Sequence, residues 1–193
     1  MSSLPARLTF RRYEPADESA VWTLHEWAMR DAGTDPDDVP GTADLRDIET
    51  AYLNTGGDFV VGILDSERAL PSSTPRDSVP RTADGPVVAI GGFMPSEAGH
   101  EDERTVPGAA ELHRMRVLPP LQGAGIGKRL LDELERRAEA AGFELALATT
   151  ASRQRNAVEF YPAAGYSEVA RSMMGEYELV HFEKPLQPVE SCD

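Results

Sequence analysis

The stretch 111–128, with the sequence ELHRMRVLPPLQGAGIGK, constrains the fold of this chain more than any other. In its first part, 111–117, successive side chains alternate between two faces as in a β-strand, and Pro119 and Pro120 end the strand. A turn with glycines at positions 123, 125 and 127 follows, and a helical pattern begins there. Because the first N–H groups of a helix are unpaired and carry partial positive charge, this strand–turn–helix unit predicts a phosphate-binding site.

The glycine spacing in this turn distinguishes between phosphate ligands. The Walker pattern G-x-x-x-x-G-K-[ST] fails, because Gly123 and Gly127 are too close and the residue after Lys128 is an arginine. The dinucleotide pattern G-x-G-x-x-G fails as well, because Lys128 stands where its last glycine belongs. The pattern that remains is Q-x-x-G-x-G, formed by Gln122, Gly125 and Gly127.

The rest of the chain interleaves strands and helices, with hairpins early and a parallel crossover later. Apolar alternation predicts strands over 8–13, 59–64, 87–94, 111–117, 144–150, 166–170 and 176–184. Helical spacing predicts helices after Asp17 and over 43–53, 125–141 and 156–164. In helix 125–141 the predicted buried stripe is Ile126, Leu130, Leu131, Leu134 and Ala138, and Gly142 is the predicted stop. The pair Gly91-Gly92 in strand 87–94 indicates a bulge or a close backbone approach. In strand 111–117, alternation places Glu111, His113, Met115 and Val117 on one face and Leu112, Arg114 and Arg116 on the other.

Three stretches together carry a resemblance to a known family. The Q-x-x-G-x-G turn resembles the pyrophosphate loop of the GNAT N-acetyltransferase superfamily, and 110–117 is similar to the strand that leads to that loop. The sequence AVEFYPAAGY over 157–166 resembles the family's A-[IV]-x-[LF]-Y-x-x-x-G-[FY] helix and strand. Residues 177–186 suit its last strand. The resemblance is strong over about 87–186 and rests on element order alone over 7–64.

This resemblance implies an α/β (α+β) GNAT fold, with a mixed sheet of about six to seven strands and about four flanking helices. We expect a single domain over 1–193, with a solvated loop insertion at about 65–85 and a flexible tail at 187–193. The implied co-substrate is acetyl-CoA, held by Met115, Arg116, Val117, Gln122, Gly123, Ala124, Gly125, Ile126, Gly127, Lys128, Gln154, Asn156 and Tyr161. The family often has an asparagine where Gln154 stands, so Gln154 and Asn156 both remain candidates.

Acetyl transfer to an amine imposes requirements on the site. An alkylamine has a pKa near ~10.4 and must lose a proton, whereas the leaving thiolate, with a solution pKa of about 8.5, benefits from gaining one. The resemblance implies Tyr161 as the acid and Glu111 as the base. His113, which alternation places on the same strand face as Glu111, is a candidate for an alternative base or proton relay. Each has a structural alternative: a core aromatic, a salt-bridged carboxylate and a packed histidine. Trp22, Trp27 and Tyr52 are candidates to line the acceptor pocket.

The composition limits the partners. A net charge of −14 argues against a general nucleic-acid-binding role, since phosphates repel an acidic surface. The chain holds 2 lysines and 17 arginines against 33 acids, which resembles proteins of salt-loving organisms and would also attract cationic amines; both interpretations remain open. No apolar run approaches the ~20 residues that span a bilayer, and residues 1–12 lack a signal core, so we expect a cytoplasmic protein without membrane partners.

Sequence features predict no metal site. Cys192 is the one cysteine, which excludes an internal disulfide and a cysteine-based zinc site. His100, among acids, is interpreted as a surface residue rather than a ligand. The acceptor is a small-molecule or protein amine, and similar proteins commonly form homodimers. The alternative function is a non-catalytic module with a GNAT fold that binds acyl-CoA and regulates a partner.

Overall fold

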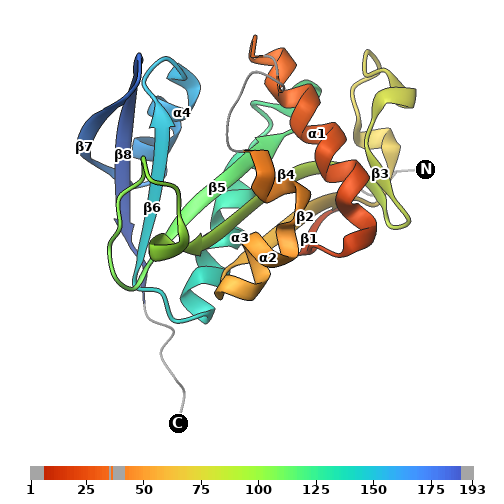
Figure 1. Ribbon diagram of the computed structural model, residues 1–193. Coiled ribbons are helices and arrows are strands. Elements are labelled where there is room, and N and C mark those ends of the chain that lie inside the picture. Colours follow the sequence, from red (N-terminus) through yellow and green to blue (C-terminus); the bar gives the residue numbers. More distant parts are fainter. Residues whose placement is uncertain (1–6, 35, 37–41, 188–193) are drawn as a thin grey trace.

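A computed structural model describes residues 7–34, 36 and 42–187 of the chain. One mixed sheet has the strand order β1-β2-β4-β5-β6-β8-β7, and the short β3 pairs with β4 (Figure 1). The strands are β1 (Leu8–Arg12), β2 (Asp58–Leu64), β3 (Arg81–Thr82), β4 (Gly85–Pro95), β5 (Ala109–Val117), β6 (Leu145–Ala151), β7 (Ser167–Met174) and β8 (Tyr177–Pro185). The helices are α1 (Glu18–Asp31), α2 (Ile48–Ala51), α3 (Ile126–Ala140) and α4 (Arg155–Ala163). The predicted mixed sheet with flanking helices is confirmed.

At the centre of the sheet lies the one parallel pair among the described strands, β5–β6, whose connection crosses over through α3. The pairs on either side, β4–β5 and β6–β8, are antiparallel. Pairing of β5 with β6 covers only Ala109–Leu112 and Leu145–Ala148. Beyond these residues the two strands diverge (Figure 1). The second half of β5 therefore lacks a β6 partner for its backbone groups.

A bulge in β5 accompanies this divergence. Ile90 pairs with Arg116 and Gly92 with His113, so β5 holds one residue more than β4 in this interval. Arg114 takes a left-handed φ of 55°, which is rare for a residue other than glycine. The bulge changes which side chains share a face of the sheet.

The predicted alternation is correct for Glu111 and His113 and wrong beyond them. Arg114 bonds to Asp44, and Arg116 donates to Sδ of Met29 in α1, so both lie on the face that α1 and α2 cover. Met115 receives a bond from Tyr161 of α4 and therefore lies on the opposite face, with α3 and α4. Because of the extra residue, side chains after the bulge lie on the face opposite to the one that simple alternation predicts. Sequence alternation alone does not reveal such a bulge.

Glycines let neighbouring side chains approach both faces of β4 closely. A Cβ on Gly91 would lie 3.1 Å from Leu134 of α3, and one on Gly92 would lie 2.6 Å from the ring of Phe59. This confirms the close approach predicted from the glycine pair. The predicted buried stripe of α3 is confirmed as well, in Ile126, Leu130, Leu131, Leu134 and Ala138. Gly142, with φ of 92°, ends the helix as predicted.

Two segments differ from expectation. The helix predicted over 43–53 is broken into a 3-10 turn (Thr42–Arg46), α2 and a second 3-10 turn (Leu53–Thr55), because the Asp47 side chain caps a new helix at Thr50. Segment 65–85 is not fully solvated, since it buries Leu70, Thr74 and Val79. Of the predicted tail at 187–193, residues 188–193 lie outside the described residues. No helix in the described ranges is long and apolar enough to cross a bilayer.

Candidate functional site

The glycine turn between β5 and α3 presents backbone rather than side chains. Gly123 and Gly125 have φ of 75° and 81°, and a Cβ at either would meet nothing within 4 Å. Glycine is therefore required by the left-handed backbone and not by lack of space. Gly125 is the N-cap of α3 and supplies no side-chain cap, so the first N–H groups of the helix lack one. This arrangement suits an anion.

The side chains around the turn are mostly engaged elsewhere. Gln122 donates from Nε2 to the carbonyl of Val117 at 3.3 Å, which ties the turn to the end of β5. Lys128 forms an ion pair with Asp132, one helical turn further along α3. The turn would therefore bind an anion chiefly through main-chain amides.

The two carboxamides near the start of α4 differ in their surroundings. Gln154 is the N-cap residue, and its Oε1 accepts a hydrogen bond from the Thr150 hydroxyl at 3.2 Å. Asn156 lies in the first turn of the helix and is exposed. Gln154 is thus partly committed to β6, while the Asn156 side chain is accessible to a ligand.

Tyr161 of α4 reaches across to β5. Its hydroxyl donates to Sδ of Met115 at 3.9 Å, and its ring packs on Phe182 of β8. Burial raises the pKa of Tyr161 above its usual value, and the negative charge of Glu111 raises it further. The hydroxyl therefore keeps its proton at neutral pH.

Glu111 is a buried carboxyl on the opposite face of β5. Its side chain is among the least accessible of the acids, with 1% exposed, and neither oxygen makes a hydrogen bond of regular geometry among the described residues. Burial raises the pKa of Glu111 to about 8, and the charge of Glu103 also raises it, although the nearby Thr149 hydroxyl favours the charged form. A buried carboxyl without a fixed partner is free to exchange a proton.

His113 lies on the same face, two residues along β5. Its Nε2 is 3.5 Å from Oε2 of Glu103, and its ring meets those of Tyr52 and His100 edge to face. Burial lowers the pKa of His113 to about 3, with the charges of His100 and Arg114 acting in the same direction. The imidazole is therefore neutral across the physiological range. His100 is exposed, as predicted.

A buried ion pair holds the β5 bulge. Arg114 donates from Nε and Nη2 to the two oxygens of Asp44, both at 2.8 Å. The Tyr52 hydroxyl donates to the same carboxylate at 2.5 Å. Tyr52 is fully buried. This cluster was not predicted, since Asp44 and Arg114 are 70 residues apart and neither belongs to a motif.

Known proteins resemble this chain in sequence and in structure. Residues 72–166 match the acetyltransferase (GNAT) family. An acetyltransferase of the GNAT family from Staphylococcus aureus Mu50 has a TM-score of 0.69 and 17% identity, over 94% of this chain and 100% of that one. The chain belongs to this family over residues 72–166. The protein yncA from Salmonella typhimurium, described as an acetyltransferase and solved with its cofactor acetyl-CoA, has a TM-score of 0.63 and 19% identity, over 97% and 98% of the two chains.

Curated relatives match a part of this GNAT chain. IAA acetyltransferase of Azospirillum brasilense is 35% identical over 42% of this chain and 55% of its own length. Aminoalkylphosphonate N-acetyltransferase of Salmonella typhimurium is 40% identical over 30% of this chain and 38% of its own length. The chain thus spans about half or less of the curated relatives that it matches.

Two hollows are found in the GNAT domain. One lies beside the loop that contains Glu103, and the other lies beside α1. A cleft of ≈ 580 Å³ opens between the β4–β5 loop and the β7–β8 hairpin and is lined by Glu101, Asp102, Glu103, Arg104, Ser172, Met173, Met174 and His181. A smaller one of ≈ 260 Å³ includes Trp22. The guanidinium of Arg46 lies 4.3 Å from the Trp22 ring centre. Trp27 is half-buried against the core. Of the three predicted pocket residues, Trp22 therefore lines a hollow.

Proposed function

We propose that this chain is an N-acetyltransferase that moves the acetyl group of acetyl-CoA to a primary amine by direct attack. The observation that carries the proposal is the placement of Glu111 and Tyr161 at the point where β5 leaves β6. Glu111 lies on one face of β5, while the Tyr161 hydroxyl meets Met115 on the other. The glycine turn at the end of the same strand supplies amides for a diphosphate.

The chain's residues have distinct parts in this reaction. Glu111 accepts the proton that the attacking ammonium loses, directly or through a water molecule. The amine nitrogen bonds to the thioester carbonyl carbon, and the carbon–sulfur bond breaks. Tyr161, which burial keeps protonated, gives its proton to the leaving sulfur. Backbone N–H groups of 115–117, on the side of β5 that β6 no longer pairs, bind the pantetheine arm and polarise the carbonyl.

Glu111 is a better base than His113. A base works best when its pKa is near the working pH, and burial brings Glu111 to about 8 but His113 to about 3. Neither Glu111 oxygen is occupied by a regular hydrogen bond. We therefore assign the base to Glu111 and leave His113 out of the proton path.

The cleft favours a cationic acceptor. Glu101, Asp102 and Glu103 line it, whereas its one arginine, Arg104, is paired with Glu183 at 2.8 Å. Two relatives are named for acetyl transfer, and the acceptor in one name is an aminoalkylphosphonate. The resulting acceptor class is a small primary amine whose ammonium enters beside these carboxylates.

A screen for thiol release tests the proposal. Acetyl-CoA is offered with a panel of aminoalkylphosphonates, polyamines, simple alkylamines and peptide amino termini, at low and high salt. We expect stoichiometric acetyl-amine and free thiol with at least one small amine. Calorimetry with CoA, ATP and NAD runs in parallel, and CoA should bind most tightly. Tight CoA binding without any product would favour a non-catalytic acyl-CoA-binding module, and no CoA binding would remove the proposal altogether.

A further inference from the structure

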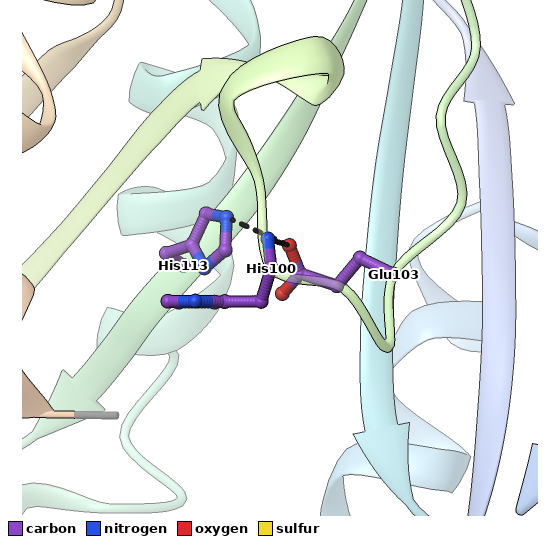
Figure 2. A group of neighbouring side chains, drawn as sticks. All are labelled: His100, Glu103 and His113. Carbon is purple, nitrogen blue, oxygen red and sulfur yellow. Dashed lines mark hydrogen bonds and ion pairs between the residues drawn. The ribbon is translucent and has the colours of Figure 1, made fainter. Parts of the chain in front are cut away.

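Three potential ligands converge where the β4–β5 loop folds against β5 (Figure 2). His100 and Glu103 come from the loop and His113 from the strand. One ligand atom from each lies within 4.8 Å of the other two. In the described part of the chain, this is the group of histidine, cysteine and acidic residues that could hold a metal ion. The proposed proton path runs through Glu111 and Tyr161 and uses none of these three side chains.

The spacing of two of these atoms already suits a small cation. Zinc binds imidazole nitrogen and carboxylate oxygen at about 2.0–2.2 Å, so two ligands in a tetrahedral site are about 3.4 Å apart. Nε2 of His113 and Oε2 of Glu103 are 3.5 Å apart. His100 is exposed on the loop, so its side chain is able to change rotamer without disturbing the core.

The second observation is the state of His113 itself. Its side chain is more than nine-tenths buried, and its Nε2 makes no hydrogen bond within the described chain. Buried polar atoms nearly always have a partner, so an unsatisfied ring nitrogen aimed at a carboxylate needs an explanation. A cation between Nε2 and Glu103 supplies one, and the His100 backbone N–H, which donates to Oε2 of Glu103 at 2.8 Å, already orients that carboxylate.

Charges around the cluster are compatible with a cation. Glu101 and Asp102 lie in the same loop as Glu103. Arg114 is the nearby positive group on β5, and its guanidinium is paired with both oxygens of Asp44. The arginine charge is thereby balanced within the core, and the loop acids add negative potential.

We propose that His100, Glu103 and His113 form a divalent-metal site that prefers Zn²⁺. Two imidazoles and one carboxylate favour zinc over the oxygen-seeking Mg²⁺ and Ca²⁺. Three protein ligands leave one coordination position for water or another donor. Glu103 also lines the ≈ 580 Å³ cleft, so the ion would join the loop to β5 at the cleft wall.

Metal titration of the untagged protein tests the site. Apo-protein is titrated with Zn²⁺ in competition with a chelating indicator, without any CoA. We expect saturation at one ion per chain. Because loss of an outer-shell partner typically costs 10–100-fold in metal affinity, removal of a ligand in His100→Ala or Glu103→Gln should weaken binding by at least about 100-fold. Co²⁺ should give the visible absorption of a tetrahedral complex, and both variants should lose it.

Matched variants keep the result interpretable. Glu101→Gln removes a neighbouring loop carboxylate that is not in the cluster and should weaken zinc binding far less than the ligand variants do, and Cys192→Ser excludes binding by the thiol. His100→Ala changes an exposed side chain, so it tests the site even if His113→Ala fails to fold. Undiminished one-to-one binding in Glu103→Gln, or no saturable binding to the wild type, overturns the proposal. Neither outcome depends on acetyl transfer, which is measured separately.

Discussion

The two sides of the gap between β5 and β6 are built in different ways. On the cofactor side, residues 122–127 and the start of α3 form one continuous piece of chain whose shape depends on left-handed glycines. On the acid–base side, Glu103, Glu111 and Arg114 take their environment from a loop, a strand and the distant Asp44. The first side is specified by local geometry and acts through backbone. The second is specified by burial, and its chemistry exists only after the whole sheet has formed.

The largest expected effect is on kcat and comes from substitution of Tyr161. This residue lies in the α4 sequence motif, but its role as proton donor depends on its burial by the surrounding structure. Tyr161→Phe removes the proton donor and should lower kcat by about 10²–10⁴-fold, the usual contribution of a general acid. CoA affinity by calorimetry should not change. Tyr166→Phe is the matched control, because that hydroxyl donates to Glu135 of α3 instead. If Tyr161→Phe keeps the wild-type kcat, Tyr161 is a core-packing residue and not the general acid.

The ion pair under the bulge tests whether the acid–base side depends on tertiary structure. Arg114→Ala leaves Asp44 buried without its cation, and breaking such a pair typically costs about 3–5 kcal/mol in the free energy of unfolding. Urea denaturation measures the change. Arg171→Ala removes an exposed arginine paired with Glu168 and should have no measurable effect on the midpoint. Equal midpoints for both variants would show that the bulge does not need its anchor.

The pH dependence of the reaction separates the base from its neighbours. The pKa of Glu111 is raised to about 8, so the carboxyl is protonated below that pH, and kcat/KM should rise as pH increases to about 8 and then level off. Glu111→Gln should lose this inflection and about 100-fold in rate. A chelator is present throughout, so that no ion at Glu103 alters the charge. Glu159→Gln, an exposed carboxylate of α4, is the control.

The same titration has a consequence for stability. Between its ordinary pKa of 4.5 and about 8, Glu111 binds a proton in the folded protein that the unfolded chain does not bind. The free energy of unfolding should therefore fall as pH rises through this window, and Glu103, with a pKa raised to about 7, contributes in the same direction. Glu111→Gln should show a shallower decline. If the free energy of unfolding changes with pH equally steeply in Glu111→Gln and in the wild type, another group causes the pH dependence.

The comparison also explains what could be predicted from the sequence. The glycine turn, the apolar stripe of α3 and its end at Gly142 follow from neighbouring residues and were all predicted. The faces of Arg114 and Met115 were predicted wrongly, because a bulge depends on how β5 pairs with β4. Glu103 was missed since no motif contains it, and its raised pKa arises from burial by distant segments. Local patterns predict where a ligand would bind, and tertiary packing decides which acids are buried and have raised pKa values.

The smallest expected effect is on CoA affinity, and it tests only the glycine turn on the proposed cofactor side. Gly125 has φ of 81° at the N-terminus of α3, and Gly142 has φ of 92° just beyond its C-terminus; a Cβ at either has nothing within 4 Å. Alanine at either position destabilises the folded protein by about 1–2 kcal/mol, because a residue with a Cβ disfavours the left-handed backbone conformation. Gly125→Ala should also displace the amides that face the diphosphate and weaken CoA binding about tenfold by calorimetry. Gly142→Ala should lower stability to a similar degree and leave CoA affinity unchanged. If both variants bind CoA equally well, the turn is a helix start and not a cofactor site.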